Sequence, residues 1–337
     1  MAVFIFRRFL GMIVVLILVS AITFVLMRTV PGGPFDREKA LPEQTIRQLE
    51  EKYHLNDPFF LQYTRYIGDI MVPRMTTGEF KRSVTEDYLI NIPLPFGDNT
   101  TIRWMNFGPS IKTRSRTVND IFRDNLPVSF QLGMAALAVA LTIGVPAGMI
   151  AALNRNTGWD YASMAIAIIG VSVPVIVMGP ILRYIFGVEL KLLPPTGWGT
   201  WQHVIMPAVS LGLASSALLA RLTRASLLQV LNEDYIRTAR AKGLTERAVI
   251  IMHAMKNAMI PVVTVIGPIF AALVTGTFVA ELVFGIPGMG KFFITSITNR
   301  DYPVIMGTVL LYAAFLVIAN MLVDITYAWL DPRIRYD

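Results

Sequence analysis

The chain has 337 residues, of which 54% are hydrophobic and only 16% are charged, and its mean hydropathy is +0.55. Soluble globular proteins carry about 25% charged residues, so this composition excludes an ordinary soluble domain and indicates a membrane protein. The chain has no cysteine, which excludes disulfides, thiolate catalysis and thiolate metal sites. The net charge of +7 is scattered along a hydrophobic chain, so we predict no nucleic-acid partner.

Six apolar runs have the length of about 20 residues that a helix needs to cross a bilayer. The first and third are the clearest, and the fourth is short and rich in serine. The runs are Phe9–Met27, Val128–Leu153, Tyr161–Phe186, Val204–Ala220, Val262–Phe284 and Pro303–Leu330. We therefore expect an all-α membrane protein with six transmembrane helices.

The first run follows Arg7-Arg8 and ends at Met27-Arg28-Thr29. It is longer than the apolar core of a usual signal peptide, and no small-x-small cleavage site follows it. It is therefore predicted to be an uncleaved membrane helix in contact with the lipid bilayer.

The long segment 29–127 lies between the first two runs. It is predicted to hold a helix over Glu43–His54 and a second one through Ile70, with Asp57 as its N-cap and Pro58 in its first turn. The second helix carries an aromatic stripe, which suits packing on the membrane or on other helices, or a platform for a ligand. Residues 72–116 are rich in Pro, Gly, Asn and Thr, which is typical of irregular or short-stranded structure.

A phosphate-loop pattern, G-x4-G-K, occurs at Gly285–Lys291. Phe292 stands where Ser or Thr should hold Mg²⁺, so a tight turn is the better interpretation. If the protein works with ATP, another chain must bind it.

Ionisable side chains within or near the apolar runs are costly and therefore candidates for function. They are Arg183, Glu281 and Asp324, near the ends of their runs. Snorkelling to the membrane interface, pairing between helices and a place on a path for a substrate or a proton are all open to them. The histidines fall in separate segments, and their spacing predicts neither a metal site nor a catalytic group.

The segment Asp234–Pro261 is polar and basic although it lies between apolar runs. A helix capped by Asp234 should run over Tyr235–Lys242, Gly243 should adopt a left-handed conformation, and Thr245 should cap a second helix towards Pro261. That second helix should be amphipathic, with one face formed by Ala248, Ile251, Met252, Met255 and Met259. From these residues alone, docking on a partner and lying on anionic lipid are equally compatible.

The distribution of Lys and Arg predicts the orientation. With the N-terminus inside, the inner segments carry 12 Lys and Arg residues and the short outer loops carry 3. Both termini and the segment 221–260 are therefore predicted to be cytoplasmic, and residues 29–127 extracytoplasmic.

Asp234–Pro261 resembles the cytoplasmic docking loop, called the EAA loop, of bacterial ABC importer permeases. The similarity is to the first of the two membrane subunits of dipeptide and oligopeptide permeases, with Arg237 and Thr238 in place of the Glu and Ala of the general pattern. Other motifs of this subfamily follow in order: Phe24–Pro34, Ile143-Gly-Val-Pro-Ala-Gly148, Leu193–Gly197, Glu281-x3-Gly285-Ile-Pro-Gly-x-Gly290, Asp301-Tyr302-Pro303 and Asp331-Pro332-Arg333. The resemblance covers nearly the whole chain, although the segment 83–117 is longer than usual and inherits no role.

The resemblance implies the type I ABC importer permease architecture in a bacterial or archaeal inner membrane. Residues 1–28 would form the N-terminal membrane helix, 29–127 an extracytoplasmic loop region, and 128–337 the core permease domain with a cytoplasmic coupling loop at 221–260. Its implied partners are a second homologous permease, two cytoplasmic ATPases that bind ATP and Mg²⁺, and an extracytoplasmic substrate-binding protein. The chain itself would be non-catalytic and bind no cofactor. The implied ATPase-docking residues are Tyr235, Ile236, Ala239, Arg240 and Gly243.

Di- or oligopeptides are the expected substrates, with nickel and oligosaccharides as alternatives within the same importer class. Two other classes are a secondary transporter and a membrane-anchored sensory or structural protein. A secondary transporter usually has more helices and acids at mid-membrane. A sensory or structural protein would leave the docking loop without a purpose.

Overall fold

The computed structural model describes residues 2–29, 33–35, 42–77, 87–95, 100–113, 115–274 and 278–330. The motif Asp331-Pro332-Arg333 and parts of the segment 83–117 lie outside these residues. The chain divides into two compact units. We call Met1–Met12, Val128–Lys291 and Ala314–Asp337 the bundle unit, and Ile13–Pro127 and Phe292–Ala313 the loop unit.

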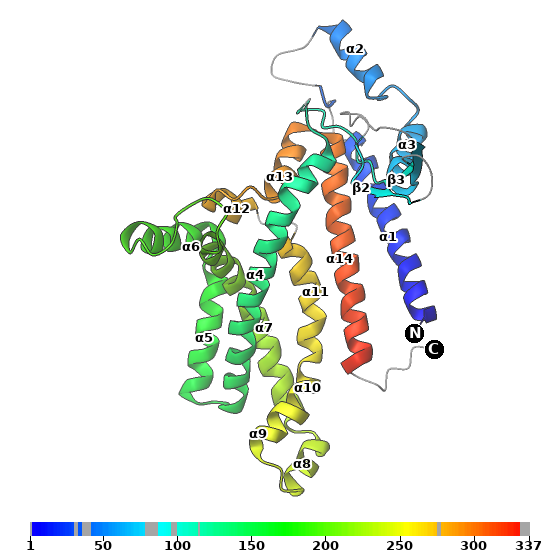
Figure 1. The fold of residues 1–337 in the computed structure, drawn as a ribbon. Coiled ribbons are helices and arrows are strands. Elements are labelled where there is room, and N and C mark those ends of the chain that lie inside the picture. The colour runs from blue at the N-terminus through cyan, green and yellow to red at the C-terminus, as the bar shows by residue number, and fades with distance from the viewer. Residues whose placement is uncertain are drawn as a thin grey trace. The chain divides into compact units, whose positions relative to one another are not determined.

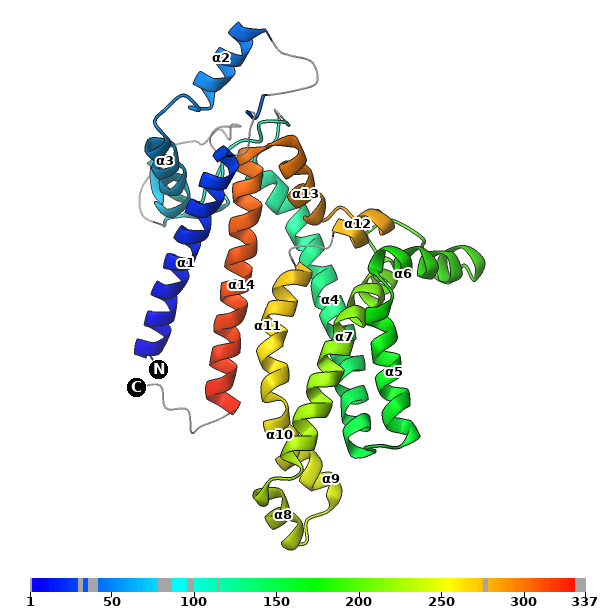
Figure 2. The same ribbon diagram turned by 180° about the vertical axis from the view of Figure 1, so that it is seen from behind.

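The bundle unit is built from helices, several of them short (Figure 1, Figure 2). In chain order it takes part of α1 (Ala2–Thr29), most of α4 (Val118–Leu153), α5 (Gly158–Ser172), α6 (Val175–Leu182), the π-helix η1 (Arg183–Glu189), α7 (Trp201–Val230), α8 (Asp234–Ala241), α9 (Glu246–Ala248), the π-helix η2 (Val249–Ala254), α10 (Met255–Ala258), α11 (Ile260–Val274), α12 (Phe278–Phe284) and the end of α14 (Tyr302–Leu330). Its largest cluster of buried side chains includes Leu132 of α4, Leu211 of α7 and Phe284 of α12. This shared core holds α4, α7 and α12 together.

Four helices are long and apolar enough to cross a membrane as single spans, namely Phe6–Thr29, Val118–Leu153, Trp201–Val230 and Tyr302–Thr326. Two bent helix pairs bring the number to as many as six among the described residues: Gly158–Ser172 with Val175–Glu189, and Glu246–Ala258 with Ile260–Val274. The chain is thus a mainly helical, multi-pass membrane protein.

The prediction of one helix over Tyr161–Phe186 is wrong, because α5 and α6 meet at an angle of 101°. Pro174 lacks an N–H group, and its ring disfavours helical backbone at the preceding residue. Val173 is accordingly extended, with φ −103° and ψ 112°. Figure 2 shows α6 running off across the end of α5.

Two other runs also differ from their predicted bounds. The run Val204–Ala220 is part of the 30-residue helix α7, which continues past Arg221 to Val230. The run Val262–Phe284 divides between α11 and α12. Hydropathy alone does not mark the polar extension of α7.

The motif Ile143-Gly-Val-Pro-Ala-Gly148 brings α4 close to α7. A Cβ atom on Gly144 would lie 2.6 Å from the Ser216 carbonyl oxygen, and one on Gly148 would lie 2.4 Å from that of Ala220. Only glycine permits this approach, which is how membrane helices pack without a strong hydrophobic driving force.

The loop unit combines helices with a small sheet. It contains the rest of α1, α2 (Glu43–Lys52), α3 (Phe59–Met71), the strands β1 (Arg74–Thr77), β2 (Ile90–Pro93) and β3 (Thr100–Trp104), nearly all of α13 (Gly290–Asn299) and the start of α14. The strands form an antiparallel sheet in the order β1-β3-β2. Short strands between 72 and 116 are confirmed, so the protein is mainly helical instead of all-α.

Two helix caps differ from the predicted ones. Pro58 occupies the N-cap of α3 and Glu233 that of α8, and neither makes a side-chain cap bond. The Asp57 carboxylate instead pairs with Arg65. The predicted cap at Thr245 is confirmed, since its hydroxyl accepts a hydrogen bond from the Ala248 amide at 3.4 Å.

Candidate functional site

The segment predicted to be the coupling loop joins α7 to α11 at one end of the bundle unit, where α8 and α9 lie together (Figure 1). Gly243 ends α8 with φ +75°, as predicted, and a Cβ atom there would have nothing within 4 Å. Left-handed backbone of this kind favours glycine. The turn therefore depends on the backbone of Gly243, while its side-chain position faces open space.

A buried cluster fixes the loop to the bundle. Ile236 and Ala239 of α8, which are 0% and 4% exposed, belong to a cluster that includes Leu227 of α7, Val249 of η2 and Ala258 of α10. A fully buried aliphatic side chain stabilises by about 1.5–3 kcal/mol relative to exposure. Movement of α8 must therefore carry α7 and α10 with it.

This placement differs from the expectation that Ile236 and Ala239 face a partner, because both side chains are turned inward. Tyr235, Arg240 and Leu244 are exposed instead. Arg240 donates to Glu246 of the same loop at 2.7 Å, and the Tyr235 hydroxyl accepts a hydrogen bond from the Asn257 amide at 2.8 Å. Of the five predicted docking residues, Tyr235, Arg240 and Gly243 are accessible.

An ion pair that sequence reasoning missed joins the turn between α4 and α5 to α7. Arg224 donates from Nε and one terminal nitrogen to the two carboxylate oxygens of Asp160, at 2.8 and 2.7 Å. The Asn156 amide donates to the same carboxylate at 3.0 Å. Bidentate, charge-assisted bonds are among the strongest in proteins. The only sequence signal was that Arg224, like Arg221, follows the apolar part of this helix.

The turn Gly285–Lys291 wraps around a carboxylate of its own chain. Glu281 is 2% exposed and accepts hydrogen bonds from the Ser129 hydroxyl at 2.9 Å and the Lys291 amide at 3.3 Å. Ser129 also accepts a hydrogen bond from the Met289 amide at 2.8 Å. Oxygen and nitrogen atoms of α4, α12 and the turn thus form one network.

Gly288 and Gly290 must be glycine because the Glu281 carboxylate lies where their side chains would be. A Cβ atom on Gly288 would lie 2.2 Å from Glu281 Oε1, and one on Gly290 would lie 3.0 Å from Oε2. The start of α13 holds the carboxylate as a phosphate loop holds phosphate, because backbone N–H groups at a helix start favour an anion. The pattern that resembles a nucleotide site therefore surrounds Glu281.

The other two ionisable residues also bond to neighbouring elements. Asp324 of α14 pairs with Arg8 of α1 at 2.9 Å. Arg183 of η1 donates to the carbonyl oxygen of Val283 in α12 at 3.1 Å. Arg183, Glu281 and Asp324 therefore each link one helix to another in this structure.

In the part of the chain that the structure describes, no group of three His, Asp or Glu side chains is arranged to hold a metal ion. The polar side chains described above instead form hydrogen bonds and ion pairs between helices.

Comparison with protein families matches most of the chain. Residues 144–336 match the family described as "Binding-protein-dependent transport system inner membrane component". Residues 1–84 match the family that describes the N-terminal part of such membrane components.

Curated relatives match this chain from end to end. The dipeptide transport system permease protein DppB of Bacillus subtilis is 42% identical over 99% of this chain and 98% of its own length. The oligopeptide transport system permease protein OppB of Salmonella typhimurium is 41% identical over 99% of both. The glutathione transport system permease protein GsiC of Escherichia coli O1:K1 is 37% identical over the same shares.

A solved structure shares the fold at much lower identity. A chain of the inward-facing MetNI methionine ABC transporter superposes with a TM-score of 0.52 at 18% identity, covering 63% of this chain and 96% of that one. At this identity the similarity concerns architecture alone.

Proposed function

Because the chain belongs to the family of binding-protein-dependent transport system inner membrane components, we propose that it is the permease subunit of an ATP-driven importer of di- or oligopeptides. The observation that carries this proposal is the similarity to a dipeptide permease over 99% of the chain. The glutathione permease is named for a small peptide as well, which supports the same substrate class.

The proposed assembly contains partners that the chain lacks. A second homologous permease would complete the translocation pathway, an extracytoplasmic binding protein would deliver the peptide, and two cytoplasmic ATPases would bind ATP and Mg²⁺. The permease itself would bind no cofactor and catalyse no reaction. The turn at Gly285–Lys291 supports this division of labour, since the Lys291 amide already donates to the Glu281 carboxylate, which lies against Gly288 and Gly290.

The proposed topology has six membrane segments, namely the four long helices, the bent pair Gly158–Ser172 with Val175–Glu189, and α11, while Glu246–Ala258 lies outside the membrane in the coupling loop. Residues 1–28, 29–127 and 128–337 would serve as membrane anchor, extracytoplasmic region and core permease domain. Both termini and the coupling loop 221–260 would be cytoplasmic, as the excess of Lys and Arg there indicates.

Coupling to ATP would pass through α8. Its exposed surface, with Tyr235, Arg240 and the turn at Gly243, would seat on an ATPase, while Ile236 and Ala239 would transmit the displacement inward. A short helix fixed to the bundle by buried contacts transmits a displacement better than a mobile loop, because packed interiors deform little.

The function is tested by reconstituting the complete transporter in liposomes. Peptide uptake is expected to require ATP, both permeases and the binding protein. Nickel and oligosaccharides should neither be taken up nor compete with the peptide. Uptake driven by an ion gradient without ATP would instead identify a secondary transporter.

The docking assignment is tested by two substitutions that share one backbone strain. Gly243→Ala and Gly243→Trp both place a side chain at φ +75°, which disfavours them equally. Only tryptophan adds bulk to the open side of the turn. We expect the tryptophan variant alone to lose ATPase co-purification and transport; equal behaviour of the two would contradict docking at this turn.

A further inference from the structure

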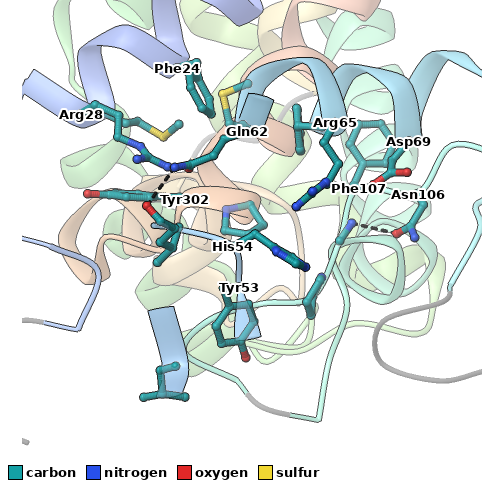
Figure 3. A pocket seen from close by; sticks show the side chains of 18 of the residues that line it. Phe24, Arg28, Tyr53, His54, Gln62, Arg65, Asp69, Asn106, Phe107 and Tyr302 are labelled. Atoms are coloured by element: carbon teal, nitrogen blue, oxygen red, sulfur yellow. Dashed lines mark hydrogen bonds between the residues drawn. The ribbon is translucent and has the colours of Figure 1, made fainter. Parts of the chain in front are cut away.

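The loop unit contains a cavity of about 750 Å³ that is open to solvent on one side (Figure 3). Its walls come from the end of α1, from α2 and α3, from residues 106–109 and from the start of α14. Aromatic side chains supply much of the surface: Phe24, Tyr53, Phe107 and Tyr302. Sites for small molecules typically measure about 300–1,000 Å³ and combine apolar walls with a few polar groups. This cavity has the size and the lining of a ligand site.

Two basic side chains in the cavity already hold a carboxylate. Arg65 donates to Asp57 Oδ2 at 2.8 Å, and His54 Nδ1 lies 3.5 Å from the same oxygen. Figure 3 shows Arg65 and His54 extending towards each other inside the cavity. Their side chains are 42% and 60% exposed, so the pair with Asp57 is a surface interaction of small net strength. A guanidinium has five N–H donors, so a second carboxylate can join Asp57 or replace it.

The backbone of His54 is in a strained conformation. Its φ is +53°, in the left-handed region that non-glycine residues rarely adopt. Such conformations cost about 1–3 kcal/mol and gather at ligand-binding positions. At His54 the conformation accompanies an imidazole that extends into the cavity.

A second cation is held against the aromatic wall. The Arg28 guanidinium lies 5.2 Å from the ring centre of Phe24 and 5.8 Å from that of Tyr302, and it donates a hydrogen bond to Gln62. Gln62 is itself fixed by its amide, which donates to the Asp57 carbonyl oxygen at 2.6 Å. Asp69 supplies the one carboxylate among the described lining residues. The cavity thus offers more positive than negative charge beside its aromatic surface.

We propose that this cavity binds short peptides, with the C-terminal carboxylate on Arg65 and His54 and apolar side chains against Tyr53, Phe107 and Tyr302. The choice of peptide rests on the proposed function. The site would hold the peptide on the permease itself, independently of the binding protein.

Direct binding tests the site. The complete transporter, placed in lipid nanodiscs without the binding protein, is titrated with fluorescent Ala-Phe-Ala and with its C-terminal amide. The amide should bind at least about tenfold more weakly, because it lacks the charge that the guanidinium recognises. Arg65→Gln should weaken the acid to the level of the amide. Arg47→Gln, on the exposed face of α2 and outside the cavity lining, should leave the tenfold preference intact.

A variant with the opposite expected sign guards against misfolding. Asp57→Asn removes the carboxylate that now occupies Arg65 and should tighten binding of the acid, an effect that a damaged fold cannot produce. Equal binding of acid and amide, absence of binding, or a preference that survives Arg65→Gln would each overturn the proposal.

ATP-driven uptake with the binding protein, measured on the same preparations, separates the two hypotheses. Uptake without direct binding would refute the site and leave the importer function standing, whereas loss of ATP-driven peptide uptake by the unaltered protein would refute the function. If Arg65→Gln weakened only association of the binding protein, the cavity would be a protein-docking site and the peptide proposal would be wrong.

Discussion

Arg224 of α7 donates hydrogen bonds to both carboxylate oxygens of Asp160, the third residue of α5, at 2.8 and 2.7 Å. Asp160 is 3% exposed, and 64 residues separate the two partners in the chain. The pair fixes the turn between α4 and α5 against the helix that leads into the coupling loop.

We expect Arg224→Gln to lower the melting temperature of the purified transporter by roughly 5 °C or more, because an enclosed carboxylate loses its counter-ion. Arg224→Lys should restore only part of the loss, since an ammonium group cannot make two parallel bonds. The double variant Asp160→Asn with Arg224→Gln should be more stable than the sum of the single effects predicts. Thermal unfolding of the unaltered protein, of Arg224→Gln and Asp160→Asn alone, and of the double variant measures this coupling.

The exposed pair of Asp234 and Arg237 supplies the control. Their atoms lie 3.4 Å apart with side chains 95% and 71% exposed, so Arg237→Gln should leave the melting temperature unchanged. A similar loss in the Arg237 and Arg224 variants would show that removal of positive charge, and not the pair, is responsible.

The Glu281 network makes a sharp prediction for one glycine. Gly288→Ala would place a methyl group 2.2 Å from Glu281 Oε1 and 2.6 Å from Ser129 Oγ, so the network must shift. We expect a loss of about 1–3 kcal/mol in the free energy of unfolding, as for other overpacked sites. Ser129→Ala should cost a similar amount, because a buried acceptor and the Met289 amide lose their partner.

Gly11→Ala is the matched control for Gly288→Ala. Gly11 lies within α1, with nothing within 4 Å of its Cβ position, so alanine should be neutral or slightly stabilising. Chemical denaturation of both variants in the same detergent provides the comparison. Equal stability of the two would mean that the turn yields without cost and that Glu281 does not fix it.

Much of the coupling loop followed from local sequence signals. Gly243 and Thr245 act through their own backbone or through a bond three residues away, so their identity was sufficient to predict their roles. The apolar face predicted for the second helix is divided in the structure, where Ile251 and Met252 are exposed and Met255 and Met259 are half-buried. The π-helix η2 adds residues to one turn and shifts the helical phase, so that Val249 is buried and Met252 is 72% exposed.

Partners distant in the chain could not be predicted in this way. Glu281 was identified as costly in a membrane, yet its contact with Ser129 spans 152 residues and depends on how α4 packs against α12. The cavity in the loop unit was missed for the same reason. Its lining runs from Phe24 to Met306, and of the aromatic stripe of α3 only Tyr66 belongs to it.

Asp69 in the cavity of the loop unit should make stability depend on pH. Burial raises the pKa of its carboxyl above the usual value, against the opposing effects of Arg74 and Arg65. The folded state therefore binds a proton more readily than the unfolded state, and stability should fall as pH rises through the window between the two pKa values. Asp69→Asn should abolish this part of the pH dependence. Hydrogen exchange of α3 at pH 4 to 7 measures the difference, and parallel profiles for the two proteins would contradict it.

Asp301 explains the motif Asp301-Tyr302-Pro303 and yields the last prediction. Its carboxylate accepts hydrogen bonds from the Ser110 hydroxyl at 2.5 Å and from the amides of Ile111 and Lys112 at 3.1 and 3.3 Å. Asp301→Ala would leave buried donors without a partner, and we expect a loss of about 2–4 kcal/mol together with faster hydrogen exchange at 110–113. Asp124→Ala removes an exposed carboxylate from the same unit and should change stability by less than about 0.5 kcal/mol. Since a general loss of negative charge would affect both variants alike, faster exchange at 110–113 in the Asp124 variant would rule out the specific role assigned to Asp301.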